Sequence, residues 1–441
     1  MIRLSDHFSL GRLLRFTFPS IIMLIFTSIY GVVDGFFVSN FVGKTPFAAV
    51  NFIMPFLMIL GCVGFLFGTG GGALIAKTMG EGKRERANEL FSMLIYVSIG
   101  CGLVLAVVGL LFVRPIAQFL GAQGQLLEDS VTYGRVILLA IPAYVLQYEF
   151  QCLFATAEKP KLGLYVTVAA GLTNMALDAL FVAVFSWGLV GAAAATALSQ
   201  CVGGILPLIY FARPNTSLLR LGKPIWHLRS LFQACANGSS ELMSNVSMSL
   251  VSMLYNWQLL RYAGEDGVAA YGVLMYVSLV FQAAFLGYSV GTAPVISYHY
   301  GAANHRELQG LLHKSLHIIG CFALAMCLAA ELLARPLSLL FVSYDPQLLS
   351  VTLRGFAIYS FSFLFSGFAI FASSFFTALN NGLVSALISF LRTLVFQVLA
   401  VLIFPLIWQL DGIWLSMVAA EVMAVGVSVV FWVTMRKKYH Y

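Results

Sequence analysis

Charged residues are scarce in this sequence: Asp, Glu, Lys and Arg make up 10% of the 441 residues, whereas a soluble domain carries roughly 25%. Hydrophobic residues make up 60%. A soluble fold could not cover its surface with so few charges, which excludes that class. Apolar runs of about twenty residues recur along the chain, and one such run as a helix crosses the ~30 Å hydrocarbon core of a bilayer. The composition therefore predicts an all-α integral membrane protein.

Motifs for metal, nucleotide or covalent chemistry are also missing. The seven cysteines are scattered through apolar runs without Cys-x-x-Cys or His spacing, so we expect no metal centre and no cofactor. The absence of a P-loop argues against an ATP-driven pump, and the absence of repeated acidic filter residues argues against a channel. No spacing singles out a Ser, His and Asp triad, so an enzyme is not expected.

Breaks at Gly, Pro, Asn and charged clusters divide the apolar sequence into twelve expected spanning helices. The first apolar run is longer than the roughly 7–15-residue core of a secretory signal, so we expect it to be retained. The expected helices are 14–39, 48–77, 88–112, 129–157, 161–184, 188–211, 229–261, 266–298, 308–333, 346–378, 382–405 and 410–435. An even number of spans places both termini on one side.

Lys and Arg lie between these helices rather than inside them. Eighteen of the 25 fall on the side of the termini, six fall on the other side, and Arg392 lies within a span. Because cytoplasmic loops carry the excess of basic residues, we expect a multi-pass protein of the bacterial inner membrane with both termini in the cytoplasm. This placement accounts for the net charge of +7 without a nucleic-acid partner.

The second part of the sequence repeats the first at one constant offset. This offset pairs Gly43 with Gly264, Gly70 with Gly291, Gly80 with Gly301, Arg114-Pro115 with Arg335-Pro336, and Trp187 with Trp408. Apolar residues match often by chance, but Gly, Arg-Pro and Trp pairs at one offset indicate a duplication. We expect two parallel six-helix repeats, over 1–211 and 229–441, related by a pseudo-twofold axis along the membrane normal and joined by a cytoplasmic linker over 212–228.

Acidic residues inside the expected helices are few, and a charge at the bilayer centre costs roughly 2.5–3.5 kcal/mol, so each is a candidate functional residue. Tyr30 and Asp34 lie one helical turn apart in the first helix, and Asn174 and Asp178 repeat this spacing in the fifth. Both aspartates lie near the outer ends of their helices, at similar depth. Two such carboxyl groups can share a proton and couple transport to it; the alternative is two independent aspartates facing water.

The second half lacks this acidic pair, because the same offset places Tyr255 at the position of Asp34 and Leu399 at that of Asp178. We therefore expect ion coupling in the first half and substrate binding at the interface. Further candidates for substrate contact or gating are Glu149, Glu241 and Asn256. For Glu241, near the start of its helix, an acid favoured by the helix dipole is an equal alternative.

Several motifs together resemble one known family. They are Pro19 followed by Tyr30-Gly-Val-Val-Asp34-Gly-Phe-Phe-Val, Asn174-Met-Ala-Leu-Asp178, Gly188-Leu-Val-Gly-Ala-Ala-Ala-Ala-Thr196 and the loop at Gly80. Over nearly the whole chain the sequence resembles the multidrug and toxic compound extrusion (MATE) transporters, in particular their bacterial MepA-like branch. The resemblance implies two V-shaped six-helix bundles that export amphipathic, often cationic small molecules in exchange for H⁺ or Na⁺ by alternating access.

The resemblance also implies roles for individual residues. The first-half proton or cation site would consist of Tyr30, Asp34, Asn174, Asp178 and Thr196. We expect the first helix to bend or repack near Pro19, and the transporter to function as a monomer in the bilayer.

The coupling ion and an alternative function stay open at this point. The Na⁺-type branch uses second-half acids on the seventh, eighth and tenth helices, and here only Glu241 is present. This favours protons, with Na⁺ at Asp34 and Asp178 as the alternative. The alternative function is a flippase for a lipid-linked precursor, which would need several Arg or Lys in its cavity to hold phosphates; Arg392 alone lies within a span.

Overall fold

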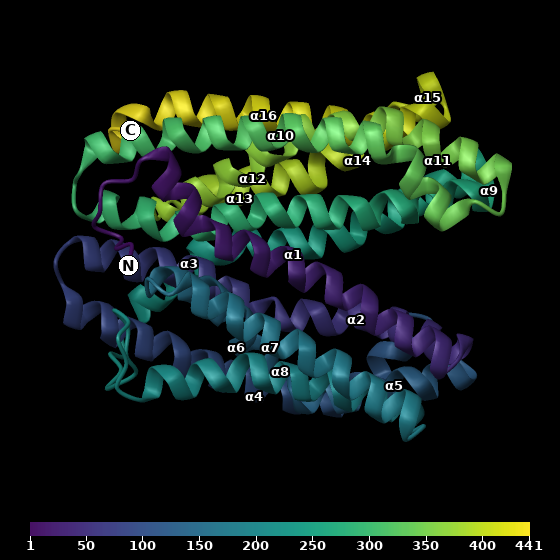
Figure 1. Ribbon diagram of the computed structural model, residues 1–441, viewed down its shortest axis with the longest axis horizontal. Coiled ribbons are helices and arrows are strands. Elements are labelled where there is room, and N and C mark those ends of the chain that lie inside the picture. The colour runs from purple at the N-terminus through teal and green to yellow at the C-terminus, as the bar shows by residue number, and fades with distance from the viewer.

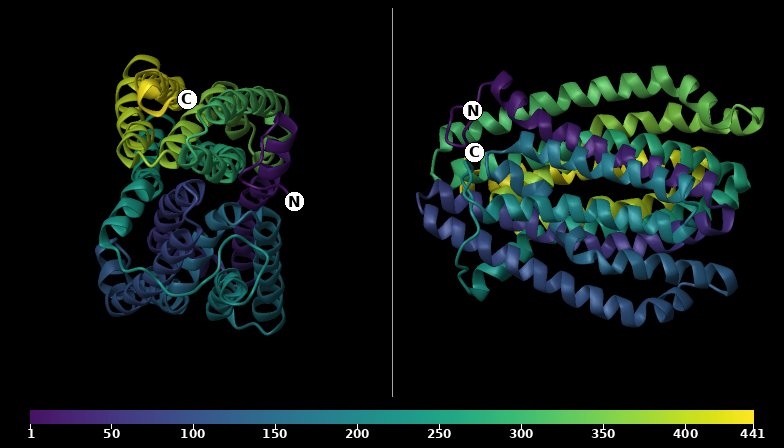
Figure 2. Two further views of the ribbon diagram at one scale, coloured as in Figure 1. Left: turned by 90° about the vertical axis from the view of Figure 1, so that its left-hand side faces the viewer. Right: turned by 60° about the horizontal axis from the view of Figure 1, so that its bottom comes forward.

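The computed structural model describes residues 1–441, apart from the side chain of Lys44, and its described elements are helices. The long helices run along one common direction and form two groups (Figure 1). Viewed from one end, the two groups lie one above the other (Figure 2).

The first half contains α1 (Leu10–Phe41), α2 (Lys44–Gly61), α3 (Val63–Gly80), α4 (Arg84–Phe119), α5 (Gly124–Leu139), α6 (Ile141–Thr156), α7 (Pro160–Asp178), the π-helix η1 (Ala179–Val184) and α8 (Gly188–Ala212). The second half contains α9 (Leu228–Gly301), α10 (His305–Val342), α11 (Pro346–Tyr359), the 3₁₀-helix η2 (Ser360–Ser362), α12 (Phe363–Ala378), α13 (Gly382–Phe390), the π-helix η3 (Leu391–Val395), α14 (Phe396–Ile403), α15 (Pro405–Trp408) and α16 (Leu410–Tyr439).

These helices supply the twelve expected spans. In the described part of the chain, ten helical segments are long and apolar enough to cross a membrane, and α5 with α6, bent by 61°, gives an eleventh. Helix α9 has 74 residues; as one straight helix, at 1.5 Å per residue, it would be about 110 Å long, more than three times the hydrocarbon core. Gly264, with φ 65°, interrupts it. Helix α9 therefore holds two spans, as the sequence predicts, and completes the set of twelve.

The duplication is visible in the backbone as well as in the sequence. Left-handed backbone conformations, which end helices and form tight turns, recur at matching places in the two halves. Gly43 matches Gly264, Gly82 matches Ala303, and Gly188 matches Gln409, each pair with positive φ and separated by the offset of the sequence repeat. Because Ala and Gln tolerate this conformation poorly, its presence at their positions reflects the shared architecture.

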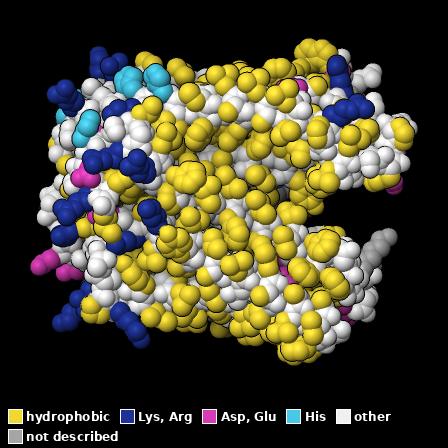
Figure 3. All heavy atoms as spheres, in the orientation of Figure 1, with side chains coloured by type: hydrophobic (Ala, Val, Ile, Leu, Met, Phe, Trp, Pro, Cys, Tyr) yellow, Lys and Arg dark blue, Asp and Glu magenta, His cyan; other side chains and the backbone are white. Residues whose placement is uncertain are grey.

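The two halves meet closely at the end of the molecule that carries both termini. A Cβ atom on Gly80 of α3 would overlap the carbonyl oxygen of Tyr298 of α9, and one on Gly301 would overlap that of Lys77. Lys77 and Tyr298 are equivalent positions of the repeat, like the two glycines. The contact is therefore self-complementary, as at a twofold axis. At the opposite end the halves separate and leave an open cleft (Figure 3).

Helix α1 contacts both halves. Near its start, the backbone at Thr17 and Ser20 lies against Gly287 and Gly291 of α9. Further along, it packs against α7 and crosses diagonally in front of the molecule (Figure 1). Pro19 is buried at the contact with α9, and α1 stays helical through it.

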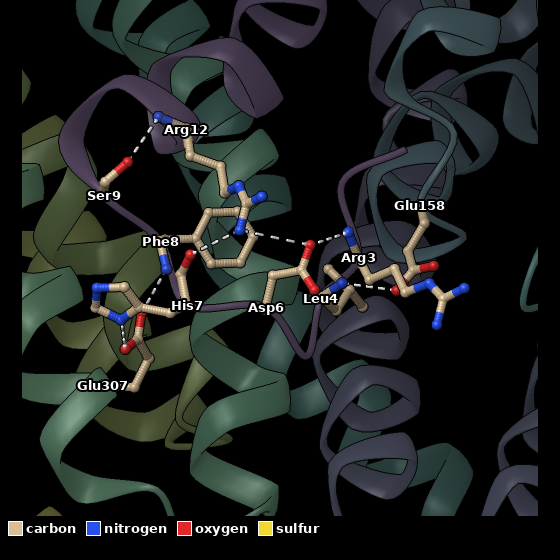
Figure 4. A network of polar contacts seen from close by, with 9 residues as sticks. All are labelled: Arg3, Leu4, Asp6, His7, Phe8, Ser9, Arg12, Glu158 and Glu307. Atoms are coloured by element: carbon tan, nitrogen blue, oxygen red, sulfur yellow. Dashed lines mark hydrogen bonds and ion pairs between the residues drawn. The ribbon is translucent and has the colours of Figure 1, made fainter.

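Residues 3–8, here called the N-terminal strap, connect the two halves at the same end (Figure 4). The Leu4 N–H donates to Oε1 of Glu158, in the turn between α6 and α7, at 2.6 Å. The Phe8 N–H donates to Oε1 of Glu307 in α10 at 2.9 Å, and Nδ1 of His7 lies 2.6 Å from the other carboxylate oxygen. The side chains of Leu4 and Phe8 are fully buried. The strap is therefore fixed to one carboxylate of each half.

The surface agrees with a membrane environment. Hydrophobic side chains cover the middle of the visible face, and Lys and Arg gather mainly at the end that carries both termini (Figure 3). Exposed Leu, Val and Phe side chains on α4 and α10 form part of this apolar band.

Candidate functional site

Four of the predicted ion-site residues lie together in the first half. The Thr196 hydroxyl in α8 donates to Oδ1 of Asp34 in α1, and Nδ2 of Asn174 in α7 donates to the same hydroxyl, both at 3.4 Å. Asp178, one turn after Asn174, is fully buried and lies within interaction range of Asp34. Three helices thus bring both aspartates into one polar cluster, here called the acidic site.

Local sequence explains how these helices come so close. A Cβ atom on Gly171 of α7 would overlap the ring of Phe26 in α1, so only glycine lets the two backbones approach. The spacing of four residues then points Tyr30 and Asp34 to one face of α1. Directly after Asp178 the backbone changes to the π-helical turn η1, a feature that occurs often at functional sites.

The acidic site has an excess of unpaired acceptors. Within the described residues, both carboxylate oxygens of Asp178, Oδ1 of Asn174 and Oε1 of Gln200 have no hydrogen-bond partner. Neither aspartate forms an ion pair with a described Lys, Arg or His side chain. Buried charges are normally paired or neutralised. The arrangement is therefore chemically suited to take up a proton or a small cation.

Three residues of this region escaped the sequence analysis. The buried hydroxyl of Tyr133 in α5 lies near Asp34 and Thr196, and Gln147 in α6 lies next to Tyr30. Gln200 follows Thr196 by one helical turn, a spacing that could have identified it. For Tyr133 no sequence signal exists, because its position depends on the packing of α5.

The remaining candidates are distributed over other places. Glu241 lines a cavity between the halves together with Thr69, Thr156 and Thr377. Asn256 is half-buried in the same helix, but it lies about four turns further on, which is about 22 Å along the axis.

Glu149 lies inside the first half. Its side chain is buried near Ser98 of α4, and its carboxylate oxygens have no partner among the described residues. Glu149 does not line the cavity that contains Glu241. The structure therefore separates Glu149 from the two other gating candidates.

The second half contains a buried ion pair instead of an acid pair. Nε and Nη2 of Arg392 in η3 donate to Oε2 and Oε1 of Glu421 in α16 at 2.9 and 3.0 Å. The side chains are 13% and 6% exposed. Nearby, the hydroxyl of Tyr255, the counterpart of Asp34, donates to Oε1 of Gln397 at 2.6 Å. The pairing of Arg392 was not predicted.

Fold and site together define a duplicated, twelve-span membrane protein with an uncompensated acid pair in one half. The family model MatE matches residues 19–180 and again residues 242–403. The chain therefore belongs to the MatE family of MATE transporters. The two matched ranges cover nearly corresponding parts of the two halves, in agreement with the internal duplication.

Relatives and solved structures agree with this assignment. The multidrug export protein MepA of Staphylococcus haemolyticus (strain JCSC1435) is 26% identical over 363 residues, which cover 80% of each chain. MepA of Staphylococcus aureus (strain N315) is 24% identical over 364 residues, again 80% of each chain. A solved structure described as the outward-facing conformation of a multidrug resistance MATE family transporter of the MOP superfamily has a TM-score of 0.92 at 22% identity and covers 98% of this chain and 97% of that chain. The predicted resemblance and fold are confirmed.

Proposed function

We propose that this protein is a secondary active antiporter of the bacterial inner membrane that exports amphipathic, often cationic small molecules in exchange for protons. The observation that carries the proposal is the acidic site, in which the buried carboxyl group of Asp178 and the half-buried one of Asp34 lie together without a basic partner among the described residues. Such a site is stable only when an ion neutralises it. The multidrug export proteins among the relatives support the class of cargo.

A proton suits the acidic site better than a sodium ion does. Asp34 and Asp178 are near enough to interact, and two adjacent carboxyl groups readily share one proton. Sodium remains the alternative, because carboxylate, amide and hydroxyl oxygens are also the ligands of hard cations. No resident cofactor is expected in either case.

The cavity between the halves has about 20 Å³ of accessible space in this conformation, so we propose that it widens to bind substrate when the halves move. Its walls are largely apolar, with threonine hydroxyl groups and the single carboxylate of Glu241. Apolar walls with few polar groups accept many amphipathic molecules, and the carboxylate would attract a cationic group. We therefore assign Glu241 to substrate binding or gating.

On the basis of the two-half architecture, we propose that transport occurs by alternating access. The halves touch at the end with both termini and diverge at the other (Figure 3), and the basic residues at the closed end support placing it in the cytoplasm. This arrangement corresponds to a conformation open to the outside. Exposure of the cavity to the cytoplasm would require α3 and α9 to separate where Gly80 meets Tyr298 and Gly301 meets Lys77, and α1 to repack on α9 near Pro19.

Ion and substrate would then exchange in turn. Protonation of the acidic site from outside would remove its charge and allow α1, which contacts both halves, to change its packing. Because α1 carries Asp34 and also lies against Gly287 and Gly291, it connects the acidic site mechanically with the interface. We propose that this connection transmits the protonation state to the cavity.

Everted membrane vesicles provide the decisive test. We expect dye uptake into the vesicles when a pH gradient with an acidic interior is imposed, no added dependence on Na⁺, and loss of this uptake in Asp34→Asn. Tyr255→Phe, at the matching position of the second half, is the control and should retain most of the uptake. Uptake that requires a Na⁺ gradient at constant pH would identify sodium, not the proton, as the coupling ion. Full activity of Asp34→Asn would contradict the proposed function.

The flippase alternative is not supported. The guanidinium group of Arg392 is held by both carboxylate oxygens of Glu421 and is therefore not available to bind a phosphate.

A further inference from the structure

The charge pattern of the second half leads to an inference about Arg392 that rests on the proposed function. We propose that Arg392 is a built-in counter-ion, which occupies in the second half the role that the transported ion has in the first, so that ion coupling is restricted to the first half. Arg392 is thus a positioning residue: it holds the carboxylate of Glu421 and balances its charge.

The ion pair lies in the counterpart of the acidic site. The offset of the sequence repeat relates Glu421 to Gln200 and Arg392 to Gly171. Gln200 and Gly171 lie next to the acidic site in the first half, each one turn from a residue of that site. Glu421 in turn lies within electrostatic range of Tyr255, the counterpart of Asp34. The same region of the duplicated fold therefore holds acids in both halves.

The space for the arginine side chain comes from matched substitutions. In the first half, the ring of Phe26 and that of Tyr30 fill the space beside Gly171. The counterparts of these aromatic residues in the second half are Ser247 and Val251 in α9, which packs against η3. Two large side chains and a glycine have thus become two smaller side chains and an arginine. We infer that the volume that aromatic rings fill in the first half accommodates the arginine side chain in the second.

The two halves reach electrical neutrality in different ways. At the acidic site, the first half holds the half-buried carboxyl group of Asp34 and the buried one of Asp178 near each other without a described basic partner. In the equivalent region of the second half, the buried carboxylate of Glu421 accepts two hydrogen bonds from the guanidinium group of Arg392. Arginine keeps its charge in proteins, and removal of one partner of a buried pair leaves the other charge uncompensated. Glu421 therefore needs no mobile ion.

Other titratable groups surround the pair. Glu241 of α9 lies within electrostatic range of Arg392, and Tyr255 of α9 and Tyr359 of α11 lie within electrostatic range of Glu421. Glu241 also feels the positive charge of Arg392. Any pH profile of a variant must therefore be compared with that of the same variant carrying Glu241→Gln.

The test uses three variants of the full-length protein: Arg392→Met, Glu421→Gln and the double variant. In Arg392→Met, Glu421 has lost its counter-ion, so we expect dye export at pH 7.5 to fall by about tenfold or more. Guanidinium ions or a more acidic pH should restore a large part of it. In the double variant both charges are gone, so export, its pH profile and the number of protons moved per dye should match the wild type within about twofold.

Two outcomes would overturn the inference. One is wild-type export by Arg392→Met that does not respond to guanidinium or pH. The other is a folded double variant, judged by its melting temperature, that has lost proton coupling. If Arg392→Met does not fold, its folded yield is measured with and without guanidinium ions. Recovery of the folded yield by guanidinium supports the inference, and no recovery overturns it. Asp34→Asn is measured in parallel. Full activity of this variant would contradict the proposed function. The role of Arg392 as a counter-ion would then be decided by the melting temperatures of the Arg392 and Glu421 variants.

Discussion

The two halves of this transporter share their backbone plan but differ in how they neutralise buried acids. The turns at Gly43 and Gly264 and the contact between Gly80 and Gly301 follow the twofold relation closely. The acids do not: the first half holds Asp34 and Asp178 near each other, whereas the second pairs Glu421 with Arg392. Positions that shape the fold have stayed symmetric, and positions that carry charge have diverged. This difference is the basis of our proposal that the first half responds to the coupling ion.

The largest effect is expected at the acidic site, where the two halves differ. Asp178→Asn removes one of the two carboxyl groups, so we expect resistance conferred on an exporter-deficient bacterium to fall to the level of the empty vector, with normal amounts of protein in the membrane. Its counterpart Leu399→Asn adds an amide to the second half and should keep most of the resistance. The measurement is a susceptibility panel of cationic dyes and drugs.

Equal loss in Asp178→Asn and Leu399→Asn would contradict the asymmetry, because it would indicate that both halves contribute alike to coupling. Full resistance in Asp178→Asn would place the coupling ion elsewhere.

The next effect tests the symmetric part of the comparison. A Cβ atom on Gly80 or on Gly301 meets a backbone carbonyl of the other half, and overpacking of this kind costs about 1–3 kcal/mol. We expect Gly80→Ala and Gly301→Ala to slow export severalfold and to similar extents, because the two positions are equivalent. Gly100→Ala, where a Cβ atom meets no neighbour within 4 Å, is the matched control. Strongly unequal effects of the first two variants on dye export would show that the contact is not functionally symmetric.

The sequence predicted the repeated architecture and the acidic site because both rest on local rules. The period of the helices, the offset of the repeat and the spacing of four residues are readable without a structure. They put Tyr30 with Asp34 and Asn174 with Asp178 on two helices, α1 and α7, which pack against each other. Helix ends were less predictable: α10 extends to Val342, beyond the expected 308–333, because it continues through Arg335 and Pro336 into the mostly apolar residues 337–342. The general expectation of twelve spans was unaffected.

Pairings between distant residues could not be predicted. Arg392 and Glu421 belong to separate helices, and no spacing rule relates them. Residues 3–8 have no helical period, so nothing in the sequence indicated that the Leu4 and Phe8 N–H groups would each bind a carboxylate of a different half. Such contacts depend on the tertiary arrangement of the two halves, which a single sequence without its relatives does not contain.

A smaller effect is expected for Glu149, an acid of the first half that lies outside the acidic site. Glu149 is buried without a described partner, but it does not line the cavity between the halves. A buried carboxyl group in such surroundings is stable in its neutral form, which glutamine imitates. We therefore expect Glu149→Gln to keep export within about twofold of the wild type, measured as dye uptake by everted vesicles. Loss of proton coupling in this variant would make Glu149 a second ion-carrying residue.

The smallest effect concerns the two carboxylates that hold the N-terminal strap (Figure 4). Burial raises the pKa of Glu158, and the hydrogen bond from the Leu4 N–H and nearby arginines oppose this only in part. A carboxyl group whose pKa is higher in the folded state makes no net contribution below its unfolded pKa of about 4.3. It destabilises the fold as the pH rises through the folded pKa.

Glu158→Gln keeps an oxygen that accepts from Leu4 but cannot ionise. We therefore expect its melting temperature in detergent to exceed that of the wild type by about 1–2 °C at pH 7.5 and to equal it near pH 4. Glu307→Gln should have the opposite sign at pH 7.5, because it loses the charged partner of His7 while keeping the bond from Phe8. A lower melting temperature for Glu158→Gln at pH 7.5 would mean that the ionised carboxylate stabilises the strap, and the two anchors would then be alike rather than opposed.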